Sequence, residues 1–165
     1  MNKPLITIQA ITPDGEFAAS YSENGLAELS FPKARRIASL PAKNDIVPAR
    51  IRAWHRVTET ALKSVLAGRA PKIFPPLDLV GTDFQKTVWN ALREIPAGKT
   101  SSYGEIARAI GKPKAVRAVG GACGANPIPV LVPCHRVLAA DGRIGGFSGG
   151  LAWKRTLLAS EGVEV

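Results

Sequence analysis

The chain has little of what builds covalent cross-links, metal sites or membrane spans. Its 165 residues include two cysteines, two histidines and one methionine. Two cysteines cannot form the disulfide framework of a small secreted protein, so we expect the reducing cytoplasm, where a thiol stays reduced. No apolar run approaches the roughly 20 residues that span a membrane, and the first residues do not form a signal peptide. We therefore predict a cytoplasmic protein without membrane contact.

Residues that hold metals or phosphates are equally scarce. The soft metal ligands are Cys123, Cys134, His55 and His135, and their spacing forms no ligand cluster. The glycine-dense stretch at residues 145–150 lacks the Gly-Lys-Ser/Thr ending of a phosphate-binding loop, and no G-x-G-x-x-G follows a strand. We predict no metal and no cofactor.

Acidic residues are few where basic residues gather. The formal net charge is +9 and the isoelectric point is about 10.0, which indicates a polyanionic partner. Between residues 108 and 155, Asp141 is the only acid. The basic residues of this window are Arg108, Lys112, Lys114, Arg117, Arg136, Arg143, Lys154 and Arg155. Such a stretch is usually a solvated face, but this one surrounds an adjacent cysteine and histidine, which favours a nucleic-acid substrate.

The pattern of apolar residues and turns predicts an α+β fold in two small lobes. Residues 5–11, 17–22 and 26–31 read as strands, separated by turn signals at 13–15 and 24–25. Residues 48–68 read as an amphipathic helix, and the proline-rich segment 69–80 reads as a linker. We place an N-terminal α/β lobe at 1–75 and a mostly helical lobe at 76–165.

The second lobe contains two helix-start signals and a helix-turn-helix pattern. Thr82 with Gln85, and Ser102 with Glu105, each form a capping box. The helix from Ser102 should end at Gly111, and a further helix is predicted over residues 114–123. Two helices joined by a short glycine-containing turn are used to read DNA grooves, although many other helix pairs share such turns.

The predicted second helix of this pair is made of small residues. Two glycines in a row, Gly120 and Gly121, each cost roughly 1 kcal/mol relative to alanine in a helix. Small residues permit close approach either to another helix or to a nucleic-acid groove, and composition leaves both readings open. Arg117 among these residues favours the groove.

Residues 133–137, PCHRV, place a thiol beside an imidazole and a guanidinium. Neighbouring cations can turn a cysteine into a reactive thiolate. The apolar, proline-bounded residues 129–133 before it predict a short buried segment that ends at the thiol. A lone cysteine is most often a small buried hydrophobe, so the local sequence leaves nucleophile and packing residue open for Cys134.

These motifs together resemble the O6-alkylguanine-DNA alkyltransferases, the methylated-DNA–protein-cysteine methyltransferases. The resemblance covers residues 81–162 closely and the N-terminal lobe only in its layout of strands followed by a helix. Besides residues 133–137 it includes the segments 81–85 (GTDFQ), 102–103 (SY), 117–121 (RAVGG), 126–127 (NP) and 148–150 (SGG).

The resemblance implies a stoichiometric DNA repair protein. Members bind duplex DNA in the minor groove by a helix-turn-helix, rotate the damaged nucleotide out of the stack, and transfer the alkyl group irreversibly to their own cysteine. Extrusion fits the physical need, because a nucleophile cannot reach the O6 substituent within the stack. The expected partner is double-stranded DNA containing O6-alkylguanine. We expect a monomer, and cooperative binding along DNA stays open.

The resemblance also implies roles for individual residues. Cys134 corresponds to the alkyl acceptor, His135 to the base that takes its proton through a water, and Glu161 to the carboxylate that orients the histidine. The catalytic set is Cys134, His135, Glu161, Asn126 and Tyr103; the substrate-binding set is Val137, Phe147, Ser148 and Lys154; the DNA-binding set is Arg117, Ala115, Ala118, Gly120, Gly121, Ser102 and Lys114.

Several of these roles are specific to one atom or group. Tyr103 corresponds to a hydroxyl that donates to the guanine ring, and the backbone of Ser148 to the donor to O6. The carbonyls of Cys134 and Val137 correspond to acceptors for the exocyclic amine. Arg117 corresponds to a finger that fills the space left by the flipped base.

Asn126 corresponds to the residue that ties the turn after the recognition helix to the active-site strand. Arg136 is predicted to form a structural ion pair, and Cys123 to be a packing residue that is not paired with Cys134. Phe147 stands where many members carry tyrosine, so a hydroxyl contact is lost there while a stacking wall is kept. Lys154 also falls at a family position.

Three other functions stay open. An alkyltransferase-like sensor would bind the lesion without transfer, although such proteins lack the cysteine that Cys134 provides. A helix-turn-helix regulator would explain the charge but not the set of Cys134, His135 and Glu161. A thiol hydrolase would turn over repeatedly rather than act once.

Overall fold

The computed structural model describes residues 5–33 and 47–165. Residues 1–4 and 34–46 lie outside the described part of the chain, and the expectation that the first residues form no signal peptide falls on the former. The elements are β1 (Ile6–Thr12), β2 (Gly15–Tyr21), β3 (Leu26–Ser30), α1 (Ala49–Leu66), α2 (Asp83–Arg93), β4 (Ser101–Ser102), α3 (Tyr103–Ala109), α4 (Val116–Gly124), the 3-10 helix η1 (Cys134–Arg136), β5 (Val137–Leu138) and α5 (Leu151–Ser160). The predicted α+β class is confirmed.

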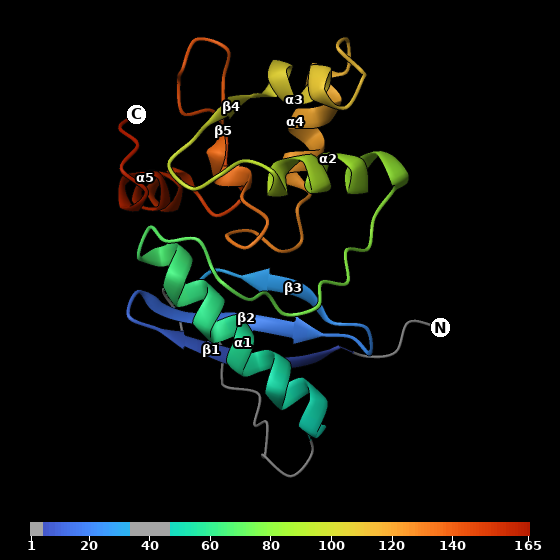
Figure 1. Cartoon of the computed structure of the whole chain (residues 1–165), viewed down its shortest axis with the longest axis vertical. Helices are drawn as coiled ribbons and strands as arrows, with labels where there is room; N and C mark the ends of the chain where they lie inside the picture. Colours follow the sequence, from blue (N-terminus) through green and yellow to red (C-terminus); the bar gives the residue numbers. More distant parts are fainter. Residues whose placement is uncertain (1–4, 34–46) are drawn as a thin grey trace.

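The N-terminal part is an antiparallel sheet in the order β1-β2-β3, with α1 lying across one face (Figure 1). Each predicted strand is found within two residues of its predicted ends, and a β-bulge shifts the register of β2 against β3 at Ser20/Tyr21. The buried hydroxyl of Tyr21 in β2 is hydrogen-bonded to α1: Tyr21 donates to Thr58, and Thr58 donates to the carbonyl of Trp54, each at 2.9 Å. A buried polar group needs such a partner to avoid a desolvation cost.

The helices of the second lobe begin where the sequence signals them. Both capping boxes are present, so Thr82 starts α2 and Ser102 starts α3. Helix α4 begins at Val116 rather than Lys114, because the N–H of Ala115 is held in a turn by the carbonyl of Lys112. The indole of Trp89 donates to the carbonyl of Ala122 at 2.8 Å and fixes α4 on α2.

The two halves of the chain share one buried core. The segment before α2 extends along β3, with backbone bonds from Leu26 to Pro76 and from Asp78 to Leu26, each 2.8 Å long. Phe17 of β2 packs edge-on against Trp153 of α5 with ring centroids 5.6 Å apart. Residues on both sides of the proposed boundary therefore contribute to the same core cluster. The division at residues 75 and 76 stays a prediction.

One glycine lies where the end of α1 meets the end of α5. Gly68 has a φ of +72°, and a β-carbon there would overlap the carbonyl oxygen of Ser160. Gly111 has almost the same backbone, with a φ of +73°, but a β-carbon there would meet nothing within 4 Å. An alanine at Gly111 therefore carries only the cost of a left-handed backbone, whereas an alanine at Gly68 also carries the cost of moving the end of α1 away from the end of α5.

We predict that Gly111→Ala lowers the free energy of unfolding by about 1 kcal/mol, the cost of left-handed backbone for alanine. Gly68→Ala should lower it by about 3 kcal/mol, because the added methyl also forces α5 away from α1. Urea denaturation of both variants measures the difference. Equal losses would mean that the Gly68 contact with Ser160 relaxes without cost.

Candidate active site

The thiol is presented by a run of tight turns. Residues 128–138 are buried, and they include the predicted buried segment 129–133. The expected active-site strand is not found before the thiol, since turns lead into η1 at Cys134. The amide of Cys134 donates to the carbonyl of Val132 at 2.8 Å around Pro133, whose φ of −81° and ψ of 61° make an inverse γ-turn. Val130 has a φ of +74°, which is strained for a β-branched residue and costs of order 1–3 kcal/mol. The surrounding core holds this strained segment in place.

Asn126 connects the end of α4 to this segment and to the thiol. Its Oδ1 accepts from the amide of Ile128 at 3.0 Å, and its Nδ2 donates to the carbonyl of Val132 at 2.9 Å. The same Nδ2 also lies 3.2 Å from Cys134 Sγ. One buried amide therefore sets both the turn and the sulfur position. The predicted tie is present, although it joins two turns rather than a turn and a strand.

Cys134 is buried, and burial raises the pKa of its thiol. The hydrogen bond from Asn126 and the charge of Lys154 oppose this rise without cancelling it. At neutral pH the group is a protonated thiol, so its reaction as a nucleophile needs a base close by. Both cysteines are free, and Cys123 is buried on α4, as predicted for a packing residue.

His135 is placed to be that base. Its Nε2 lies 3.1 Å from Glu161 Oε1, and since a carboxylate only accepts, Nε2 carries the hydrogen. Burial lowers the pKa of His135, so the ring is neutral at pH 7 and Nδ1 has a free lone pair. Nδ1 is buried, and no group in the described part of the chain donates to it. A neutral imidazole oriented by a carboxylate is the arrangement of a general base.

Glu161 joins three segments at the end of α5. Its two oxygens accept the Nε and terminal nitrogen of Arg136 at 2.7–3.1 Å, and its Oε2 accepts the amide of Gly98 at 3.2 Å. Arg136 also donates to the carbonyl of Ile95 at 2.6 Å, which confirms its predicted structural ion pair. Burial alone would raise the pKa of Glu161, but the hydrogen bonds from His135 and Arg136 outweigh it and bring that pKa to about 2. The side chain is 1% exposed and ionised.

Tyr103 stands at the first turn of α3 beside the glycine-rich loop. A β-carbon at Gly145 would lie 3.3 Å from its hydroxyl oxygen, and one at Gly120 would lie 4.0 Å from its ring. Burial raises the pKa of Tyr103, and negative charge on Cys123 or Cys134 would raise it further. The hydroxyl therefore keeps its proton and can donate it in a hydrogen bond.

Lys154 lies fully buried beneath the site. Its Nζ donates to the carbonyls of Val137 at 2.6 Å and Gly146 at 3.1 Å, so it ties β5 and the loop of residues 145–150 to α5. Burial lowers its pKa, and the charge of a Cys134 thiolate would raise it. The positive charge of Lys154 thus stabilises the thiolate form of Cys134.

The loop places Phe147 and Ser148 on the side of the N-terminal sheet. Phe147 is half-buried and packs edge-on against Phe31, with ring centroids 5.6 Å apart. Ser148 is exposed, and within the described residues its backbone N–H makes no hydrogen bond. The carbonyl of Val137 already accepts from Lys154, and that of Cys134 accepts from the amide of Val137. A carbonyl oxygen has two lone pairs, so each can accept one more donor.

The predicted DNA-binding residues lie on the helix-turn-helix, away from the core. Arg117, Ala118 and Gly121 of α4 are exposed, as is Lys114 before it, while Ala115 and Gly120 are partly exposed. Ser102 is partly exposed, and its oxygen accepts from the amide of Glu105 as the cap of α3. A β-carbon at Gly121 would meet nothing within 4 Å. Packing within the protein therefore does not require a glycine at this position.

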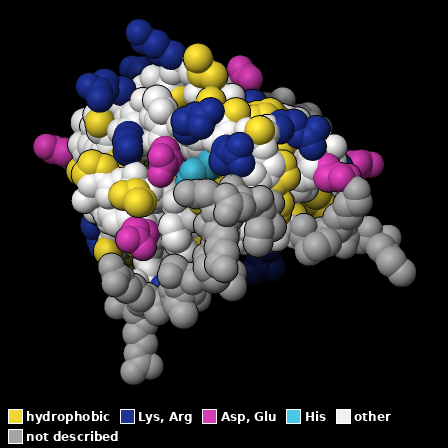
Figure 2. Space-filling model, turned by 90° about the horizontal axis from the view of Figure 1, so that it is seen from below, with side chains coloured by type: hydrophobic (Ala, Val, Ile, Leu, Met, Phe, Trp, Pro, Cys, Tyr) yellow, Lys and Arg dark blue, Asp and Glu magenta, His cyan; other side chains and the backbone are white. Residues whose placement is uncertain are grey.

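A second set of basic residues lies outside the window of residues 108–155. Helix α1 carries Arg50, Arg52, Arg56 and Lys63, with Glu59 as its one acid. Lys and Arg side chains stand among hydrophobic ones on the face of the N-terminal lobe seen in Figure 2. These residues are visible in the sequence of 49–66, but no motif beside them points to a partner.

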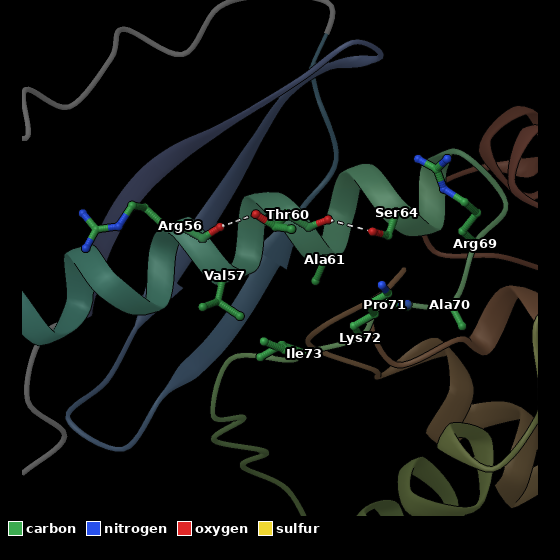
Figure 3. Close-up of a pocket in the computed structure, with 10 residues that line it drawn as sticks. All are labelled: Arg56, Val57, Thr60, Ala61, Ser64, Arg69, Ala70, Pro71, Lys72 and Ile73. Carbon is green, nitrogen blue, oxygen red and sulfur yellow. Dashed lines mark hydrogen bonds between the residues drawn. The ribbon is translucent and has the colours of Figure 1, made fainter.

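A cavity of about 660 Å³ lies elsewhere, between α1 and residues 69–73 (Figure 3). Its two hydroxyls, on Thr60 and Ser64, donate to carbonyls of their own helix. Arg56 and Arg69 stand at its two ends and point away from the segment that carries Ile73. No cysteine or histidine lines it, so it offers no chemistry of the kind found at Cys134.

Neither a metal site nor a membrane span is found in the described ranges. No group of three or more His, Cys, Asp or Glu residues there could hold a metal ion. No helix there is both long and apolar enough to cross a bilayer.

Comparison with known proteins gives the class of this fold and site. A sequence model described as the DNA binding domain of 6-O-methylguanine DNA methyltransferase matches residues 83–163. The crystal structure of Mycobacterium tuberculosis OGT in complex with DNA is similar, with a TM-score of 0.74, 40% identity, and 94% of this chain and 90% of that one covered. An O6-methylguanine DNA methyltransferase from Methanococcus jannaschii gives a TM-score of 0.67 at 26% identity, over 96% of this chain and 95% of that one.

Curated relatives give the family. A methylated-DNA–protein-cysteine methyltransferase of Methanosarcina acetivorans is 41% identical over 154 residues, which cover 92% of this chain and 94% of that protein. One of Methanosarcina mazei is 45% identical over 139 residues, covering 84% and 85%. This chain belongs to the methylated-DNA–protein-cysteine methyltransferase family.

We predict that Glu161→Gln lowers the free energy of unfolding at pH 7 by about 3 kcal/mol, because it leaves the buried Arg136 without its counter-charge. The pKa of Glu161 is lowered by folding, so its contribution is complete above pH 4.5 and is lost as the pH falls towards about 2. The difference in the free energy of unfolding between wild type and Glu161→Gln should therefore become smaller below pH 4.5. Urea denaturation from pH 7 to pH 3 measures it.

Glu164→Gln is the matched control, since Glu164 is exposed three residues further along the chain. It should change stability little at any pH. A constant gap for Glu161→Gln down to pH 3 would contradict the ion pair as the source of its effect.

Proposed function

We propose that this chain repairs O6-alkylguanine in duplex DNA by transferring the alkyl group to its own Cys134, once per molecule. The observation that carries the proposal is the connected set of Asn126, Cys134, His135 and Glu161. A buried thiol is held at 3.2 Å by an amide, and it is followed in the chain by a neutral histidine that a carboxylate orients at 3.1 Å. Membership of the family and the similarity to a DNA complex support the same reaction.

The transfer is a displacement at the alkyl carbon. His135 Nδ1 takes the proton of the Cys134 thiol, through a bridging water, and Nε2 stays bonded to Glu161. The sulfur forms a bond to the alkyl carbon as the bond from that carbon to guanine O6 breaks. The electron pair of the broken carbon–oxygen bond stays on O6 of the guanine. The proton that left the thiol ends on the guanine ring, so the product is unmodified guanine. Lys154 stabilises the thiolate that forms along this path.

The guanine is recognised by groups on both sides of the thiol. Tyr103 donates its hydroxyl hydrogen to the ring, and the N–H of Ser148 donates to O6, where negative charge develops. The free lone pairs of the Cys134 and Val137 carbonyls accept from the exocyclic amine. Phe147 supplies a flat wall against the base. These roles follow the family pattern, and the exposure of Ser148 and the protonated state of Tyr103 support them.

The DNA is held by the helix-turn-helix. Its exposed small residues, Ala118 and Gly121, permit close approach of the α4 backbone to a minor groove, while Lys114 reaches phosphates. Arg117 fills the place of the extruded base. The catalytic residues all belong to one chain, so we infer that a monomer acts. We also infer action in the cytoplasm, on nucleoid DNA where the cell is bacterial, because the substrate is DNA and the thiol must stay reduced.

The test is intact-protein mass spectrometry after incubation with a duplex that contains one O6-methylguanine, followed by peptide mapping. We expect a gain of one methylene on Cys134 that saturates at one per molecule. Cys134→Ala should show no gain but still prefer the lesion duplex over undamaged DNA.

The other outcomes point to different functions. An unchanged wild-type mass with tight lesion binding would favour the sensor. Repeated turnover would favour a hydrolase. No gain and no lesion preference would overturn the proposal.

A second prediction tests the small-residue face of α4. Gly121→Leu should raise the free energy of unfolding slightly, by about 0.5 kcal/mol, since leucine is a better helix former and the space is open. The same change should weaken binding to duplex DNA at least tenfold, because the side chain blocks backbone approach to the groove. Anisotropy titration at fixed salt measures the affinity. An unchanged affinity would argue that this face does not enter the groove.

A further inference from the structure

The loop of residues 145–150 is held at three places in the described structure. Gly145 lies against the Tyr103 hydroxyl, and the carbonyl of Gly146 accepts from Lys154. These two anchors come from the C-terminal lobe. The third comes from the N-terminal sheet, where Phe31, just after β3, contacts the far half of the loop.

The third anchor is made by one ring. Phe31 packs edge-on against Phe147 at 5.6 Å between centroids, and a β-carbon at Gly149 would overlap the same ring. Ser148, whose N–H we assign to O6, lies between these two contacts. Phe31 is itself fixed by Trp153 at 5.1 Å and Phe17 at 5.5 Å. The Phe31 ring is therefore held by the core and in turn contacts the residues on both sides of Ser148.

Hydrogen bonds between described residues do not replace this contact. Beside it lies a cavity of about 440 Å³, whose lining includes Phe31 and Pro32 after β3, Ser148 and Gly149 of the loop, and the segment of residues 126–129. Within the described residues, no hydrogen bond joins residues 147–149 to the N-terminal lobe. If the Phe31 ring were removed, the loop could therefore move into this space.

We propose that Phe31 of the N-terminal lobe is a positioning residue for alkyl transfer, because it holds the backbone of Ser148 where the leaving O6 is stabilised. This inference rests on the proposed function. Donors to a developing negative charge act only when they are held in place before the reaction, and a displacement of about 1 Å can cost about a hundredfold in rate. The N-terminal lobe thus takes part in the reaction without touching the substrate.

The test compares Phe31→Leu, Phe31→Tyr and Phe17→Leu. Phe17 is a matched control, since its ring belongs to the same cluster but has no ring contact with Phe147. The readouts are the single-turnover rate of methyl transfer from O6-methylguanine duplex at saturating protein, the affinity for undamaged duplex at fixed salt, and the midpoint of thermal unfolding.

We expect Phe31→Leu to slow transfer about tenfold, in line with the strength of an aromatic pair. Its affinity for undamaged duplex should not change, because the ring contacts of Phe31 are with Phe17, Phe147 and Trp153 and none is with α4. Phe31→Tyr should restore the rate, since it keeps the ring. Phe17→Leu should lower the unfolding midpoint at least as much as Phe31→Leu and leave the rate within twofold of wild type, because Trp153 still packs against Phe31 in that variant.

Two results would overturn the inference. Equal slowing by Phe31→Leu and Phe17→Leu would show that only general packing matters, and a wild-type rate for Phe31→Leu would show that the loop needs no support. Failure of the proposed function is distinguishable, because wild type itself would then gain no methyl group.

Discussion

The site depends on one buried carboxylate. Glu161 receives the Arg136 guanidinium, the His135 ring and the Gly98 amide, and Arg136 continues to the Ile95 carbonyl. The end of α5, the 3-10 helix that carries the thiol and the loop after α2 meet at this one group. A charge buried to this degree is tolerated only when it is paired and fully hydrogen-bonded. The hydrogen bonds of Glu161 therefore fix the three segments relative to one another. They also fix the tautomer of His135, with the hydrogen on Nε2.

The same burial sets the chemistry of the thiol. In water-exposed positions a nearby cation would produce a reactive thiolate, but here burial keeps Cys134 protonated and His135 neutral. The protonated sulfur is thus a weak nucleophile, and in the proposed mechanism it is activated when its proton moves to His135. This suits a protein that acts once, since a permanently ionised thiol would be lost to other electrophiles and oxidants. Lys154 supplies a fixed positive charge that becomes important only when the thiolate forms.

Local signals allowed much of this to be predicted from the sequence. The capping boxes at Thr82 and Ser102 depend on residues three apart, and both helices begin where they indicate. The strands, α1 and the buried segment before Cys134 follow from the periodicity of apolar residues. Helix α4 begins two residues later than the sequence predicts, because nothing in the sequence distinguishes the turn at Ala115 from a first helical residue.

Contacts between distant segments could not be predicted in the same way. The burial of Glu161 depends on Arg136, 25 residues away, and near a chain end a glutamate usually lies in solvent. The link from Phe31 to Phe147 joins residues far apart in the chain, with no pattern that pairs them. The left-handed backbone at Val130 contradicts its β-branched side chain, so only the finished core explains it.

A protein that keeps its product needs no path for releasing it, and this removes a constraint that shapes most enzymes. Lids and hinges exist largely to admit substrate and let product leave. Here the alkyl group stays on Cys134, and only an ordinary guanine must return to the duplex. The moving part can therefore be the DNA, which brings its base to the protein, while the protein can hold its thiol on a strained, buried and extensively hydrogen-bonded backbone. A fixed protein site and a moving DNA agree with three features of the structure: the turns around Pro133, the Asn126 amide and the hydrogen bonds of Glu161. Each of them would hinder a site that had to open after every reaction.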